Sequence, residues 1–375
     1  MLKKYEKMDY RVQLMRIVAC FMVIGCHVRL EPVINGGLDK ELLLLHGFFD
    51  DGVAVFFTIM GFFLLSKTVS IWKSTGKTFL HILIPVFLLK ICVFVFHDWI
   101  LQEASFIECL LAFHIDINDL IQNILTLNFS SEDFCGHLWY ITSYLRIIVL
   151  LPVIKLLTDK TESTKKVCQW IIFINVLSMV VTDLSVLLSS SIPIGTFMIF
   201  DVSVTYVVIG YMLYQNKAAL ESNRRLRYLC LPGMPIIIIL RFVLQCYLFQ
   251  RNANYSYFYF WNTGISLLFT LCFVCFFLTF PVKAPKKPYT IINYIGAKTF
   301  AIYLMHMAVY SFLDHRGVRD SFYAVTVWKK ANIFTKGAYD FSYPLLVFFC
   351  CLILCLLWDT VKFSMIHIRH LFSNK

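Results

Sequence analysis

The chain has 375 residues, of which 59% are hydrophobic and 15% are charged, and its formal net charge is +11. Soluble globular chains are typically about 45–50% apolar and about 25% charged, so this composition excludes an ordinary soluble enzyme. Lys and Arg lie in short segments between hydrophobic runs, as they do in the cytoplasmic loops of membrane proteins. The charge pattern therefore favours a polytopic membrane protein and argues against nucleic-acid binding.

Hydrophobic runs of about 20 residues recur along the whole chain and predict an all-α bundle of about ten transmembrane helices. The first run carries Arg16 and lacks a small-residue cleavage site, so we interpret it as a retained helix and not as a signal peptide. The bundle forms a single domain over residues 1–375. We expect helices near residues 12–30, 49–66, 79–97, 137–157, 167–188, 196–215, 228–249, 257–281, 291–313 and 342–363.

The distribution of charge also predicts the orientation of the bundle. With a cytoplasmic N-terminus, most of the 34 Lys and Arg residues fall in cytoplasmic segments, and an even number of helices returns the C-terminus to the same side. The segment at about 98–134 carries only acidic charges and has the pattern of an amphipathic helix on the outer face. Both termini are therefore predicted to be cytoplasmic.

The thirteen cysteines do not indicate a disulfide framework, because most of them lie within hydrophobic runs and act there as small apolar residues. Cys109 and Cys135 lie in or beside the predicted outer segment, so a bridge between them stays open. Cysteine and histidine do not occur together at zinc-binding spacing, so we expect no metal site.

Ionisable residues within predicted helices are costly in lipid, and they usually face a partner or a cavity. Their number here indicates that a polar substrate is handled inside the bundle. Arg146, Asp201 and Arg241 are interpreted as members of stabilising pairs. The complete set is Arg16, His27, His81, Lys90, Arg146, Asp183, Asp201, Arg241, Lys298, His306 and Asp359.

Arg16 and His27 form the sharpest pair in this set. Eleven helical positions place them on one face and about 16 Å apart along the axis. A guanidinium suits a phosphate or carboxylate, and a neutral imidazole suits a general base. The structural alternative is that Arg16 extends to the headgroups and His27 bonds a neighbouring helix.

Two further runs combine histidine with aromatic residues, at 137–140 and 302–306. Trp139 belongs either to an aromatic belt at the membrane interface or to a platform for a sugar ring. His137 and His306 stay open between a structural role and a place in a site.

Taken in order, these motifs resemble those of the membrane-bound acyltransferase-3 family. Arg16 and His27 match the first-helix signature of that family, and residues 52–65 resemble its second helix. Residues 137–140, followed by Pro152, are similar to its fourth-helix pattern, and residues 300–306 resemble its late motif ending in histidine. The resemblance covers nearly the whole chain.

The resemblance implies a membrane O-acyltransferase of the plasma membrane that modifies a cell-envelope or exported glycan. The donor substrate is acyl-CoA, with acetyl as the first expectation and succinyl or longer chains open, and no further cofactor is implied. A lipid-linked glycan acceptor, a homo-oligomer, and the role of His27 as base or acyl carrier also stay open. The implied site residues are His27 and Arg16 for catalysis, Lys77 and His81 for the donor, and His137, Trp139, Tyr303 and His306 for the acceptor.

The chain departs from the family pattern at two places. Met60 stands where the family usually has serine before the glycine of the second helix, and Lys77 and His81 stand near the expected arginine pair. The rival interpretation is a polar-solute transporter or flippase, in which the buried charges are coupling groups. That interpretation predicts no covalent product.

Overall fold

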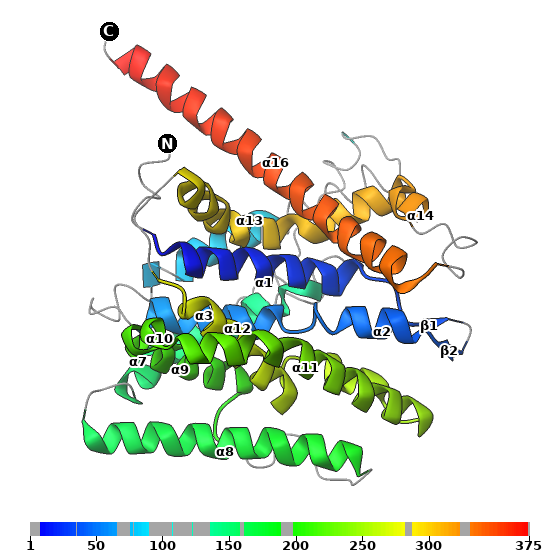
Figure 1. Ribbon diagram of the computed structural model, residues 1–375. Helices are drawn as coiled ribbons and strands as arrows, with labels where there is room; N and C mark the ends of the chain where they lie inside the picture. Colours follow the sequence, from blue (N-terminus) through cyan, green and yellow to red (C-terminus); the bar gives the residue numbers. More distant parts are fainter. Residues whose placement is uncertain are drawn as a thin grey trace.

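The computed structural model describes residues 8–34, 36–65, 76–77, 79–89, 107, 122, 136–157, 161–188, 198–281, 287–322 and 331–373. Within this part of the chain the structure is a bundle of helices with one very small hairpin, which confirms the all-α prediction (Figure 1). The predicted amphipathic segment 98–134 lies outside the described residues except at 107 and 122, and so does the Cys109–Cys135 pair.

Helix α1, Tyr10–Val28, lies in the middle of the bundle (Figure 1). The Asp9 carboxylate caps its start by accepting a hydrogen bond from the backbone N–H of Arg11. The helix packs against α13 (Lys287–His315), α3 (Gly52–Leu64), α16 (Ile333–Ser373) and α12 (Gly264–Leu278). A residue on α1 can therefore face several helices, and this central position makes α1 the natural carrier of a site.

The segment between α1 and α3 is ordered in a way that hydrophobicity does not predict. Strands β1 (Val33–Ile34) and β2 (Gly37–Leu38) form an antiparallel hairpin, and α2 spans Lys40–His46. Asp39 starts α2, because its carboxylate accepts from the backbone N–H groups of residues 41 and 42. The expected helix 49–66 consequently begins later, at the first residue of α3.

Helices α3 and α9 (Val202–Gln215) cross closely because glycine stands at both contact points. A Cβ atom at Gly61 would collide with the backbone oxygen of Val207, and one at Gly210 would collide with that of Thr58. Only the absence of a side chain permits this approach. The crossing lies in the largest hydrophobic cluster of the described chain.

Helices α7, α8 and α11 complete the bundle with bounds close to those expected from hydrophobicity, whereas α10, η3 and α14 are short elements that the sequence did not predict. Pro152 lies inside α7, and Pro232 and Pro235 lie inside α11. These elements are a helix over Phe79–Leu89, η2 (Gly136–Leu138), α7 (Trp139–Leu157), α8 (Glu162–Leu187), α10 (Lys217–Ser222), α11 (Arg224–Gln250), η3 (Tyr255–Tyr259) and α14 (Val318–Phe322).

Six helices of the described chain are long and apolar enough to cross a membrane, which supports a membrane protein. Three shorter apolar helices, at 52–64, 79–89 and 202–215, coincide with predicted crossings, whereas α13 is not among the six. Trp170, Phe173 and Leu184 are exposed along α8, which suits a face toward lipid. The total of about ten crossings and the cytoplasmic termini stay predictions.

Candidate functional site

Three histidine rings from three different elements meet at the C-terminal end of α1. His27 lies in the last turn of α1, His137 in η2 and His306 in the middle of α13. The ring centroids of His137 and His306 are 4.9 Å apart, and the centroid of His27 lies 5.3 Å from His306 and 6.4 Å from His137. His137 and His306 are buried, whereas His27 is half-buried. We call these three residues the histidine cluster.

Tyr303 links two members of the histidine cluster. Its hydroxyl donates a hydrogen bond to the backbone oxygen of His137, and its ring centroid lies 5.6 Å from each of the His137 and His306 centroids. The hydrogen bond joins η2 to α13 across the bundle. Tyr303 therefore fixes where His137 stands relative to His306.

The hydrogen bonds around His306 define which of its nitrogens is available. Nδ1 donates to the backbone oxygen of Tyr303 at 2.5 Å, so in a neutral ring Nε2 carries the lone pair. Nε2 is buried without a hydrogen-bond partner in the described chain, and the His27 ring makes no hydrogen bond there either. His306 and His27 thus offer imidazole nitrogens that can accept a proton.

Arg16 lies on α1 below the histidine cluster, as the helical spacing predicts. It is half-buried, and its Nη1 donates to Oε1 of Gln13 at 3.3 Å. Tyr140 and Tyr144 of α7 are its electrostatic neighbours, and no described carboxylate forms an ion pair with it. The Tyr140 ring lies 5.4 Å from Tyr303, so a polar and aromatic strip leads from Arg16 to the cluster.

Trp139 stands apart from the other predicted acceptor residues. Its ring stacks on Trp261, with centroids 5.7 Å apart and planes inclined by 13°. Phe57 lies between this stack and the site, at 5.2 Å from Trp261 and 4.8 Å from Tyr140. The structure therefore brings His137, Tyr303 and His306 to His27, and joins Trp139 to them only through an aromatic layer.

Lys77 and His81, predicted to bind the donor, lie elsewhere in the described chain. Both side chains are exposed, and Nδ1 of His81 donates to the backbone oxygen of Lys77 at 2.8 Å. No hydrogen bond, ion pair or ring contact joins them to Arg16 or to His27 in the part of the chain that the structure describes. Their place in donor binding stays a prediction.

Comparison with known protein families gives an independent result. Residues 9–358 match the acyltransferase-3 family, described as an acyltransferase domain. The chain belongs to this family. The match spans the whole histidine cluster and Arg16, and it makes the protein a membrane acyltransferase. No curated protein and no solved structure matches the chain.

Several buried charges of this acyltransferase are paired and lie outside the histidine cluster. Arg241 donates to both carboxylate oxygens of Asp51, at 2.9 and 2.8 Å, and to Asp50 at 3.3 Å. Arg29 also contacts Asp50, at 2.6 Å. Pairing compensates charges that are removed from water, so loss of one partner of this network would leave a buried charge uncompensated. The predicted pair for Arg241 is therefore present.

Arg146 and Asp201 differ from the prediction that they form stabilising pairs. Arg146 is exposed on α7 without a described ion pair. Asp201 is exposed and caps α9, because its carboxylate accepts from the backbone N–H of Ser203. Hydrophobic runs alone place both residues inside helices. In the structure Arg146 does lie inside α7, but Asp201 precedes the first residue of α9.

Sequence reasoning missed two contributors near the site of the acyltransferase. Gln13 is buried and holds the Arg16 guanidinium, and Trp261 stacks on Trp139. Gln13 lies three positions before Arg16. Residues at this spacing are neighbours on a helix, so the sequence did contain a signal for this contact. No signal in the sequence pairs Trp261 with Trp139, because their contact depends on how α7 meets the segment between η3 and α12.

Proposed function

We propose that this acyltransferase moves an acyl group, in the first place acetyl, from acyl-CoA to a hydroxyl of a cell-envelope or exported polysaccharide at the plasma membrane. The observation that carries the proposal is the histidine cluster. His27, His137 and His306 converge from three elements at one end of the helix that also holds Arg16. An imidazole whose nitrogen can accept a proton, as proposed for His27 and His306, is the group that proton transfer at neutral pH requires.

The reaction forms a bond between the acceptor oxygen and the acyl carbonyl carbon, and it breaks the bond from that carbon to the CoA sulfur. The hydroxyl proton passes to a neutral imidazole and then to the CoA thiolate, which leaves as the thiol. His27 is the proposed base, because its half-buried ring makes no hydrogen bond to described residues. In the second route the same ring attacks the thioester and carries the acyl group to the hydroxyl.

The neighbours of His27 have separate proposed roles. Arg16 faces the donor side, where its guanidinium would attract an anionic or carbonyl group of acyl-CoA. His137, Tyr303 and His306 are proposed to contact the acceptor. The stacked rings of Trp139 and Trp261 would lie beside a sugar as an apolar platform.

The transporter interpretation depended on buried charges free to couple to a solute. In the described chain several of those charges are already paired: Arg241 binds Asp51, and Lys298 lies 2.5 Å from Asp359. Asp183 accepts hydrogen bonds from the Tyr257 hydroxyl and the backbone N–H of Gly264. These contacts leave few coupling groups, which favours the enzyme over the transporter.

The experiment follows the acyl group into a product. Proteoliposomes containing the protein receive [¹⁴C]acetyl-CoA together with an envelope polysaccharide extract, and the polymer is then isolated. We expect label in the polysaccharide that mild alkali releases, since that is the behaviour of an ester. Intact [¹⁴C]acetyl-CoA, or unmodified glycan, that crosses the bilayer with no label in the polysaccharide would instead support the transporter. No product with acetyl-CoA or longer acyl-CoAs would refute the proposed function.

A further inference from the structure

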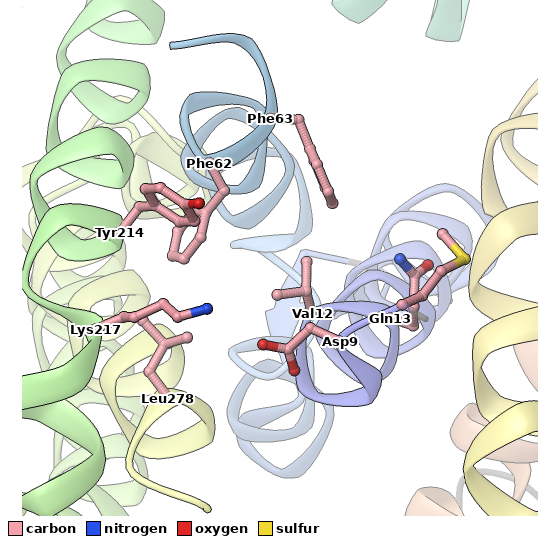
Figure 2. A pocket seen from close by; sticks show the side chains of 9 residues that line it. Asp9, Val12, Gln13, Phe62, Phe63, Tyr214, Lys217 and Leu278 are labelled. Carbon is pink, nitrogen blue, oxygen red and sulfur yellow. The ribbon is translucent and has the colours of Figure 1, made fainter. Parts of the chain in front are cut away.

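A cavity of about 310 Å³ lies beside the first turn of α1, at the end opposite to the histidine cluster. Figure 2 shows Val12 on one side and Phe62 with Tyr214 on the other, from α1, α3 and α9. Phe63 and Leu278 add to these apolar walls. The volume is within the range of small-molecule sites, and the walls suit the largely uncharged arm of a ligand.

Lys217 is the cation that lines this cavity. Its ammonium points into the opening, toward the side that carries Asp9 (Figure 2). Lys217 is half-buried, and no described carboxylate forms an ion pair with it; its Nζ lies 5.6 Å from the centre of the Tyr214 ring. An ammonium held in this way is available to an anionic ligand.

Asp9 also lines the cavity, but its charge is engaged by Arg11. The carboxylate accepts from Nε of Arg11 at 2.9 Å and from Nη2 at 2.7 Å. Burial raises the pKa of Asp9, but the hydrogen bonds and positive charge of Arg11, together with the positive charge of Lys217, outweigh burial and hold the pKa below its ordinary value. Asp9 therefore stays ionised and is hydrogen-bonded to Arg11. Lys217 feels the charge of Asp9 without forming an ion pair with it, so its ammonium keeps donors for an external anion.

Two arginines near the cavity are already engaged. Arg11 is buried, pairs with Glu221 at 2.8 Å as well as with Asp9, and donates to the backbone oxygens of Leu278 and Phe280, at 3.1 and 2.6 Å. Arg227 donates to the backbone oxygen of Thr279, between those two residues. The predicted orientation places this end of α1 in the cytoplasm, where a soluble nucleotide thioester is available.

Gln13 of α1 belongs both to the cavity wall and to the surroundings of Arg16. Gln13 lines the cavity and accepts a hydrogen bond from Arg16. From Gln13 to His27 the helix rises about 21 Å, at about 1.5 Å per residue. An extended pantetheine arm with its thioester has a comparable length, so a ligand whose phosphates lie at the mouth could reach the histidine cluster.

We propose that this cavity is the entrance for acyl-CoA, with Lys217 contacting the diphosphate and the pantetheine arm passing Gln13 toward Arg16 and His27. The inference rests on the proposed function. It assigns the phosphates to Lys217 in place of Lys77, and it makes Gln13 a positioning residue for Arg16.

The test compares two donors and two lysines. Lys217→Met is assayed with acetyl-CoA and with S-acetyl-pantetheine, which lacks the phosphates, and Lys166→Met removes an exposed lysine of α8 as the matched control. We expect Lys217→Met to raise KM for acetyl-CoA about tenfold, because a hydrogen bond to a charged group is lost. For Lys217→Met we also expect kcat, and KM for S-acetyl-pantetheine, to equal the wild-type values. Lys217→Arg, which keeps the positive charge, should have the wild-type KM for acetyl-CoA.

The other outcomes separate this inference from the proposed function. Turnover by the wild type with equal KM for Lys217→Met and Lys166→Met would overturn the entrance and leave the acyltransferase activity standing. A KM that rises equally for both donors would mean that Lys217 acts on the fold, which also overturns it. A wild type that uses no acyl-CoA would remove the proposed function and this inference together.

A second measurement does not depend on turnover. Lys217→Cys is treated with a maleimide in the presence and absence of S-ethyl-CoA, a thioether with no free thiol to consume the reagent, and labelling at residue 217 is quantified by mass spectrometry. We expect S-ethyl-CoA to slow the labelling at this position, whereas S-ethyl-pantetheine, which lacks the phosphates, slows it less. Labelling that is unaffected by S-ethyl-CoA would contradict a phosphate contact at Lys217.

Discussion

The arrangement of single residues explains how neutral imidazoles are kept ready in a membrane protein. Backbone groups, not carboxylates, orient the ring of His306: its Nδ1 donates to the Tyr303 carbonyl, and Nε2 is left without a described partner. A carboxylate partner would favour the protonated ring, which cannot accept a proton. The absence of such a partner around His27 and His306, within the described chain, suits a base.

At this scale we predict a positioning role for Tyr303. Tyr303→Phe removes the hydrogen bond to the backbone of His137 and keeps the ring. We expect kcat to fall about 10- to 100-fold, because small displacements of reacting groups are costly, while KM for acetyl-CoA is unchanged. Steady-state CoA release measures both parameters.

The control for this prediction is Tyr228→Phe, which alters an exposed tyrosine of α11. It should match the wild type in both kcat and KM. If Tyr303→Phe also matches the wild type, the link between η2 and α13 does not position the site.

Several site residues could be predicted from the sequence because a single helix fixes their spacing. Arg16 and His27 share α1, and the 137–140 and 302–306 runs stand out as polar groups in apolar surroundings. The contact of His137 with His306 could not be predicted, since it depends on how η2 and α13 meet in space. Trp139 was grouped with the histidines by sequence proximity, but its ring turns to Trp261.

At the scale of helices and strands, glycines and helix caps determine where short elements begin and how closely helices pack, which hydrophobicity does not predict. Runs of apolar residues predicted α1, α8 and α11 well, because a long run leaves little choice of structure. The hairpin and α2 between residues 33 and 46 were missed, because the Asp39 cap and the φ of 77° at Gly36 are local polar and backbone signals. Helix α16 is longer than predicted because it continues beyond its apolar run at both ends.

We predict that the α3–α9 crossing is a point of high sensitivity. Gly210→Val places a branched side chain against the backbone of Thr58, and overpacking of this kind costs about 3 kcal/mol. We expect a clear loss of thermal stability in detergent, measured by thermal shift with tryptophan fluorescence.

The matched control is Gly76→Ala, at a position where an added Cβ meets no atom within 4 Å. It should leave the melting temperature unchanged. Equal stability of Gly210→Val and the wild type would show that the two helices do not cross as closely as described.

At the scale of the whole molecule, the long apolar helices extend from one side of the membrane to the other. Helix α11 is one of the six long apolar helices, so its two ends should lie on opposite sides. The cavity with Lys217 and the histidine cluster lie toward opposite ends of α1. A donor that enters at one side and an acceptor that binds at the other would meet within the bundle.

Orientation is testable with cysteines at the two ends of α11. Ser222→Cys and Arg251→Cys are exposed positions beside its start and end. We expect an impermeant maleimide to label Arg251→Cys on intact cells and Ser222→Cys only after permeabilisation, with the wild type giving the background from its native cysteines. The reverse pattern would invert the proposed topology and place the cavity outside.

The most direct test of the central claim is acyl transfer by purified protein in lipid, with [¹⁴C]acetyl-CoA as donor and the envelope polysaccharide extract as acceptor. The variants are His27→Ala, Arg16→Ala and, as control, His315→Ala, which removes an exposed histidine of α13. We predict that His27→Ala lowers CoA release by at least about 10²-fold with the fold intact, and that His315→Ala matches the wild type. Full activity of folded His27→Ala would contradict the account, because the histidine cluster would then not be the site of chemistry.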